Sequence, residues 1–223
     1  MTDQSFDEFV TELRDDADAA TYNLGYMKAI LDESIVSEKL DRSFSGHAMA
    51  IATAAVKRSL ALYCARAWDK SIDAVSLPNG KKRIASLADM RQRWEGWFTG
   101  DHARHRVAKV EASYDRFSKD FSSALADDSH ISLRVFRSEW LAHRITYSND
   151  RRKSEKAGPV DNVTMNQLVS CAEQTVLLVG DLGFLCDGMK NPYPERITRV
   201  ERHCREFWRV LPVLGNVEDS RCE

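Results

Sequence analysis

The chain has 223 residues, of which 43% are hydrophobic and 30% charged, and its formal net charge is −2. These values exclude an intrinsically disordered chain and are typical of a globular protein with one substantial core. No run approaches the roughly 18 to 20 consecutive apolar residues that a membrane span needs, so we expect no membrane contact. We expect one domain over residues 1–215, a loose tail over 216–223 and, because the acidic start does not resemble a signal peptide, a cytoplasmic location.

The first third of the chain predicts two amphipathic helices. Apolar residues recur at alternating steps of three and four, which places them on one face of a helix. The first predicted face carries Phe6, Val10, Leu13, Ala17, Ala20, Leu24, Met27 and Leu31. The second helix is predicted to begin near Ser45, and its face carries Val56, Leu60, Tyr63 and Ala67. Residues 71–90 are predicted to form a loop containing Pro78-Asn79-Gly80 and then a short helix.

The same spacing predicts three further helices. The third helix, preceded by Gly100-Asp101, carries Val107, Val110, Tyr114, Phe117 and Phe121. After a polar connector over 148–161, the next carries Leu168, Cys171, Thr175, Leu178, Leu182 and Leu185 and ends at Gly188. The last is entered through Pro192 and Pro194 and carries Ile197, Val200, Cys204, Phe207 and Leu211. No window alternates with period two, so the sequence predicts an all-α helical bundle.

Between the third helix and the polar connector, Arg137 and His143 stand six positions apart in an apolar helical segment. Arginine is a permanent planar cation suited to phosphate oxygens, and histidine exchanges a proton near neutral pH. Together they suit the cleavage of a phosphodiester without a metal. Arg42 with His47 and Arg196 with His203 have similar spacings, but large apolar residues frame only the Arg137 pair.

Around this pair the chain resembles the HEPN superfamily, whose helical bundles carry an arginine, a polar residue, a short spacer and a histidine often preceded by alanine. Arg137, Ser138, Ala142 and His143 match in that order. The layout is similar to the abortive-infection AbiU-type branch, including a second helix that ends in a Trp-Asp pair at residues 68–69. The chain departs from the common pattern at Ser138, where active members usually have Asn, Asp or His.

The resemblance implies a HEPN-like bundle that is a metal-independent endoribonuclease in phage defence or a toxin–antitoxin system. His143 would act as general base or acid in the attack of the ribose 2′-hydroxyl on the adjacent phosphate, Arg137 would stabilise the phosphoryl charge, and Ser138 would assist by hydrogen bonding. Six helical positions turn through about 600°, so Arg137 and His143 point roughly 120° apart and one protomer is an incomplete site. The resemblance implies a homodimer with a shared cleft and a possible antitoxin partner.

Basic residues around the motif predict contacts with RNA. Between Arg134 and Lys156 there are seven basic and three acidic residues, and phosphate backbones are attracted to such a local excess of positive charge. The candidate RNA-binding residues are Arg134, Arg144, Tyr147, Arg151, Arg152 and Lys153. In the alternative interpretation His143 is a hydrogen-bonded core residue, and the protein is a non-catalytic interaction or regulatory module that dimerises through the Arg137/His143 face.

We expect neither a metal nor a cofactor. The five cysteines are far apart in the sequence and lack Cys-x-x-Cys spacing, so they indicate neither a zinc site nor a disulfide framework and are expected to fill the core. His102 and His105 are close enough to share a metal, but no carboxylate or cysteine stands at a convincing third position.

Overall fold

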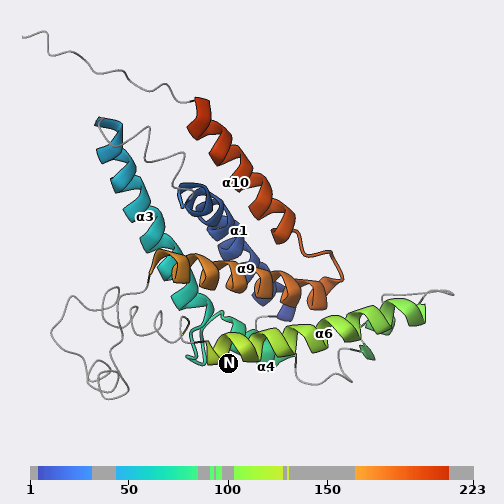
Figure 1. The fold of residues 1–223 in the computed structure, drawn as a ribbon. Helices are drawn as coiled ribbons and strands as arrows, with labels where there is room; N and C mark the ends of the chain where they lie inside the picture. The colour runs from blue at the N-terminus through green and yellow to red at the C-terminus, as the bar shows by residue number, and fades with distance from the viewer. Residues whose placement is uncertain are drawn as a thin grey trace, which may run out of the picture.

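The computed structural model describes residues 5–31, 44–84, 91–92, 94–96, 103–127, 130 and 164–210, which form helices and the loops between them and contain no strand. The helices are α1 (Phe6–Ile30), α3 (Phe44–Ala67), α4 (Leu77–Arg83), α6 (Ala103–Ala126), α9 (Met165–Asp187) and α10 (Tyr193–Val210). The protein is therefore an all-α helical bundle, as the sequence predicts. In Figure 1, α9 lies between α6 on one side and α1 on the other, and α10 runs beside α1.

The helices begin and end where their sequences satisfy the free backbone groups. At the start of α1, the Ser5 hydroxyl accepts a hydrogen bond from the Glu8 backbone N–H, and the Glu8 carboxylate accepts one from the Ser5 N–H. Thr164 and Gln167 form the same capping box at the start of α9. The far end of α9 closes at Gly188 with φ 72°, a left-handed conformation that glycine adopts without a Cβ clash.

Contacts between side chains fix the directions of the helices. Along α1 the contacts to α9 run in reverse order: Asp7 bonds Cys186 near the end of α9, and Lys28 bonds Glu173 near its start. The two helices are therefore antiparallel. By contrast α10 runs parallel to α1, because the Tyr193 hydroxyl donates to the Arg14 carbonyl at one end and the Tyr26 and Trp208 rings meet at the other.

The main core forms where α1, α3, α6 and α9 converge. The predicted apolar faces supply most of it: Leu13, Leu24 and Met27 from α1, Leu60 from α3, Phe117 from α6, and Leu178 and Leu182 from α9 are at most 2% exposed. Burial of such side chains stabilises a fold by about 1.5 to 3 kcal/mol each. Ala29, Met49 and Trp208 form a smaller cluster between the ends of α1, α3 and α10.

Two details of the sequence prediction are wrong. Phe207 was expected on the buried face of α10, but it is 55% exposed, and its neighbour Trp208 is buried against Met49 and Ala29 instead. Pro78-Asn79-Gly80 was expected in a loop before a short helix, but it lies inside α4. Proline is tolerated there because the first N–H groups of a helix have no partner within it.

By length and mean hydropathy, two of the described helical segments could cross a membrane: Gly46–Ala67 (1.2) and Met165–Asp187 (1.4). In the second, 67% of the apolar window is buried against other helices, as in the core helix of a bundle; in the first, 33% is buried. Since a core helix passes the same test, length and composition do not assign either segment to a membrane.

Gly25 lets α1 and α10 approach each other closely, and this contact leads to a prediction about stability. A Cβ at this position would lie 2.5 Å from Val200 Cγ1 and 3.0 Å from the backbone nitrogen of Glu201. Because a backbone atom cannot rotate away, Gly25→Ala should separate the helices and lower the free energy of unfolding by about 1 to 3 kcal/mol. Urea denaturation measures the difference.

Gly96→Ala is the matched control for Gly25→Ala. Gly96 is also helical and exposed, and a Cβ there would have no neighbour within 4 Å. We expect this change to leave stability unchanged or raise it by up to about 1 kcal/mol, since alanine favours helix more than glycine does. Equal stability of Gly25→Ala and wild type would contradict the close packing described for α1 and α10.

Candidate functional site

The predicted catalytic residues Arg137, Ser138 and His143 lie outside the described residues. The same holds for the predicted RNA-binding residues Arg134, Arg144, Tyr147, Arg151, Arg152 and Lys153. Their assignment therefore stays a prediction. The structure does describe both flanks of the stretch that carries them: His130 on one side and Thr164, at the start of α9, on the other.

His130 is anchored firmly in the bundle. It is only 3% exposed, and its Nε2 lies 2.9 Å from the Gln174 side-chain oxygen on α9. A carbonyl oxygen only accepts, so in this arrangement the imidazole donates. The His130 and Trp68 rings also pack in a T-shaped arrangement, with ring centroids 4.9 Å apart. His130 is therefore held against the end of α3 and the first half of α9.

Trp68 ties this corner of the bundle together. Its indole N–H donates to the Thr175 hydroxyl at 2.9 Å, and that hydroxyl donates to the Cys171 carbonyl at 2.6 Å. Its ring packs against Phe121 of α6, with centroids 5.2 Å apart. Burial, and secondarily Asp127, raises the pKa of the Cys171 thiol to about 12, so the thiol is uncharged at neutral pH. The Trp68 indole, the Thr175 hydroxyl and the His130 ring at this corner are therefore all hydrogen-bonded.

The other two arginine–histidine spacings do not form a site in the described part of the chain. Arg196 forms an ion pair with Asp18 of α1, while His203, further along α10, is exposed. His47 is also exposed, on the first turns of α3, and Arg42 lies outside the described residues. An arginine that already binds a carboxylate is poorly placed to bind a phosphate, which argues against the Arg196 pair.

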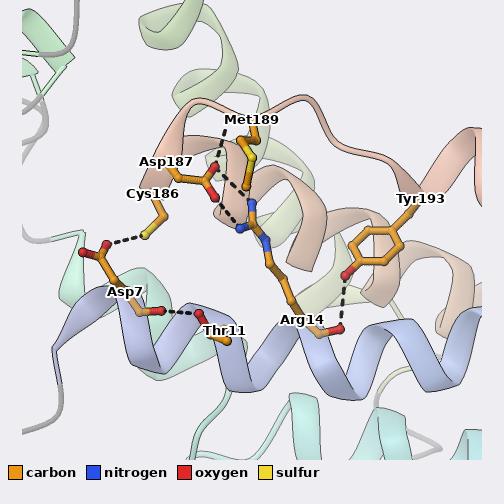
Figure 2. Close-up of polar contacts among 7 residues, drawn as sticks. All are labelled: Asp7, Thr11, Arg14, Cys186, Asp187, Met189 and Tyr193. Carbon is orange, nitrogen blue, oxygen red and sulfur yellow. Dashed lines mark hydrogen bonds and ion pairs between the residues drawn. The ribbon is translucent and has the colours of Figure 1, made fainter.

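A second arginine cluster joins α1 to the end of α9 (Figure 2). Arg14 forms a two-pronged ion pair with Asp187, whose carboxylate also accepts from the Met189 N–H at 2.9 Å. Burial acts to lower the pKa of Arg14, but the bonds to Asp187 outweigh it and raise the pKa. Beside it the Cys186 thiol donates to Asp7 at 3.0 Å. The Asp187 carboxylate neutralises the Arg14 guanidinium, so this cluster has a structural role in linking α1 to the end of α9.

An acidic pocket of about 410 Å³ opens between α1, the end of α3 and the loop before α4. It is lined by Glu12, Asp15, Asp16, Arg66, Asp69, Ala74 and Val75. Asp16 is bound by Arg66, which ties α1 to α3. Within the described ranges, no three or more histidine, cysteine, aspartate or glutamate residues are arranged to hold a metal ion. The negative charge makes this pocket an unsuitable place for an RNA phosphate.

Sequence reasoning singled out Trp68, through the Trp-Asp pair, but missed His130. An isolated histidine after the end of a helix carries no periodic signal, and its partner Gln174 is 44 positions away. Of the cysteines expected to fill the core, Cys64, Cys171 and Cys186 are buried and Cys204 is partly exposed. Burial, foremost, raises the pKa of the Cys64 thiol, so it too is uncharged at neutral pH.

Comparison with known proteins gives one result. The family model HEPN_AbiU2, described as AbiU2, matches residues 3–207. The match covers all the described helices up to the last turn of α10, and also the stretch with Arg137 and His143. No curated protein and no solved structure matches the chain.

Proposed function

Because the chain belongs to the HEPN_AbiU2 family, an abortive-infection group of HEPN-type proteins, we propose that it is a metal-independent endoribonuclease that acts in phage defence or as a toxin. The observation that carries this proposal is the family match over residues 3–207, because the Arg137 and His143 pair falls within it. The all-α bundle supports it as the fold that such proteins have. His47, Arg196 and His203, which have similar spacings, are exposed or bound to a carboxylate.

The proposed reaction is an intramolecular transfer of the phosphoryl group. His143, as a base, takes the proton of the ribose 2′-hydroxyl while that oxygen forms a bond to the adjacent phosphorus. The bond from phosphorus to the 5′-oxygen of the next nucleotide breaks, and the leaving oxygen takes up a proton from an imidazolium. Arg137 stabilises the charge that builds on the phosphoryl oxygens, and Ser138 donates a hydrogen bond. The products are a 2′,3′-cyclic phosphate and a 5′-hydroxyl.

We further propose that two copies of the chain make the site. Arg137 and His143 point roughly 120° apart on an ideal helix, so a two-fold mate supplies the second half of the chemistry. We propose that the RNA backbone is bound by Arg134, Arg144, Tyr147 and residues 151–153. We also propose that the protein is cytoplasmic and that an antitoxin protein inhibits its activity. Light scattering tests the dimer: a monomer at all assayed concentrations would contradict the shared site.

A chemically defined substrate tests the proposed reaction. An RNA oligonucleotide that wild-type protein cleaves at one bond is compared with the same oligonucleotide carrying a single 2′-deoxy nucleotide on the 5′ side of that bond. Without the 2′-hydroxyl the attacking nucleophile is missing, so we expect cleavage at that bond to stop while binding persists. Cleavage of the deoxy bond at the wild-type rate would rule out this mechanism.

A further inference from the structure

The first half of α3 exposes apolar side chains that the proposed reaction does not use. Residues 46–56 contain no aspartate, glutamate, lysine or arginine, and of these residues only Met49 is buried. Ile51 is 61% exposed and, further along the helix, Leu62 is 44% exposed. By contrast, charged residues occur along the exposed sides of α6 and α10. A helix that is apolar on both its inner and its outer side is typical of one that a second partner covers.

Four apolar residues and a serine form a single stripe, which we call the outer face of α3: Ala48, Ile51, Ala55, Ser59 and Leu62. Steps of three and four place these residues within about 80° of one another around the helix axis. All five are exposed, whereas the opposite side of α3 packs against α1 and α9 in the core. The outer face is therefore an apolar surface that the described helices leave uncovered.

The outer face is complementary in size to a second copy of itself. A two-fold axis perpendicular to α3 would pair the helix with its copy in the antiparallel direction. With that axis at Ala55, the large Leu62 of one copy stands opposite the small Ala48 of the other, and Ile51 stands opposite Ser59. Ala55 faces itself, and its short side chain lets the two backbones approach to about 8 Å.

The length of α3 also suits such a pair. Ala55 lies at the middle of the 24-residue helix Phe44–Ala67, so the whole helix overlaps with its copy. At about 1.5 Å per residue and a diameter of about 10 to 12 Å, the outer half of the helix presents on the order of 600 Å². Two copies can therefore bury up to about 1,200 Å², slightly more than the roughly 1,000 Å² that a specific interface needs. An interface at this lower limit forms a weak dimer.

A membrane is a less suitable occupant of this surface. The length and mean hydropathy of Gly46–Ala67 would allow insertion, but Arg58 is exposed on the same side of the helix as Ile51 and Leu62. A membrane would have to bury this permanent charge in hydrocarbon. Against a second copy, Arg58 stands opposite Ala52 at the edge of the outer face, where its long side chain reaches water.

We propose that two copies of the chain associate through the outer faces of α3, packed antiparallel about a two-fold axis at Ala55. The charge-free first half of the helix, the pairing of large with small residues and the central position of Ala55 all support this arrangement. The proposal rests on described residues alone and does not require that the protein cleaves RNA.

Sedimentation velocity of the purified full chain tests the interface at about 1 to 100 μM, where dimers with micromolar Kd form. Ala55→Glu places two carboxylates against each other at the axis and should raise the dissociation constant at least about 100-fold. Ala50→Glu is the matched control, because it adds the same charge at an exposed position of α3 about 140° around the axis from Ala55. Its dissociation constant should stay at the wild-type value, and circular dichroism checks that both variants fold.

Ala55→Cys tests the position of the axis without adding a charge, and it decides the question if Ala55→Glu does not fold. A residue on a two-fold axis meets its own copy, so this variant should form a disulfide between two chains on mild oxidation. Ala50→Cys should not, and wild type gives the background from the native cysteines. Gel electrophoresis without reducing agent separates the cross-linked from the single chain.

A wild type that is monomeric throughout this range would overturn the proposal, as would an Ala55→Glu variant that folds and dimerises as tightly as wild type. Equal cross-linking of Ala50→Cys and Ala55→Cys would contradict the proposed axis. A wild type that is monomeric in solution but binds vesicles of anionic phospholipid would assign the outer face to a membrane instead. A dimer that Ala55→Glu disrupts, in a protein that cleaves no RNA, would support this inference and contradict the proposed function.

Discussion

Replacing His143 with alanine should lower the rate of RNA cleavage by about 100- to 10,000-fold, the usual contribution of general acid–base catalysis. Arg137→Ala should also abolish detectable cleavage, because no other cation in the proposed mechanism stabilises the phosphoryl oxygens. Both variants should keep the helical circular dichroism spectrum of wild type. The measurement is the single-turnover rate constant on a labelled RNA, with binding followed separately by fluorescence anisotropy.

His47→Ala and His203→Ala are the matched controls for this prediction. Each histidine follows an arginine at a similar spacing in the sequence, and each is exposed on its helix, α3 or α10. Their replacement should leave the rate constant at the wild-type value. If the His143→Ala variant cleaves RNA at the wild-type rate, the proposed site is wrong. A wild type without activity, together with a His143→Ala variant that unfolds, would instead favour the alternative of a structural histidine in an interaction module.

The second large effect is expected on stability, from Trp68→Ala. Trp68 is 4% exposed, packs against Phe121 and His130, and donates its indole N–H to Thr175. Removing such a side chain leaves a cavity where α3, α6 and α9 meet, and it should cost about 3 to 5 kcal/mol. Since domains of this size have a total stability of only about 5 to 15 kcal/mol, urea denaturation should show a much earlier midpoint.

Trp68→Phe separates packing from hydrogen bonding in the same place. The phenyl ring still packs against Phe121, while the Thr175 hydroxyl loses the hydrogen bond that it accepts from the indole N–H. The expected loss is roughly 1 to 2 kcal/mol, from one buried hydrogen bond and a small change in volume. A Trp68→Ala variant with nearly wild-type stability would mean that this corner of the bundle is not packed as described.

Most of the fold could be predicted from the sequence because apolar residues recur at helical spacing along each helix. In α9 all six predicted face residues, from Leu168 to Leu185, are buried, and Gly188 ends the helix as expected. The error in α10 has a clear cause. Both Phe207 and Trp208 continue the three-four steps from Cys204, so periodicity cannot choose between them. Trp208 is the one that is buried, because it contacts Met49 and Ala29, which come from distant parts of the chain.

The error in α4 has a similar cause. Pro78-Asn79-Gly80 is a typical turn sequence, but the surrounding bundle favours a helix there. Asn79 donates to the backbone carbonyls of Ser71 and Ala74, and a Cβ on Gly80 would lie 2.7 Å from Leu182. Glycine therefore permits the close approach of α4 to α9. Local sequence cannot reveal such a contact, since its partner is about 100 positions away.

The candidate site rests on the sequence more than the fold does. Arg137 and His143 were found by their spacing and by the likeness to HEPN proteins, and the family match supports the likeness. Their geometry lies outside the described residues. The structure contributes contacts elsewhere in the bundle: His130 held by Gln174, Arg196 bound to Asp18, and an acidic pocket that does not suit phosphate. Neither pairing has a local signal in the sequence, because its two partners are 44 and 178 positions apart, respectively.

The most direct test of the central claim is the chemistry of the RNA ends produced by purified wild-type protein in the presence of EDTA. Mass spectrometry of the fragments distinguishes the possible ends. The metal-free mechanism of Arg137 and His143 predicts undiminished cleavage with EDTA, leaving 2′,3′-cyclic phosphates and 5′-hydroxyls. Loss of all cleavage on adding EDTA, or fragments with 3′-hydroxyls and 5′-phosphates, would contradict it.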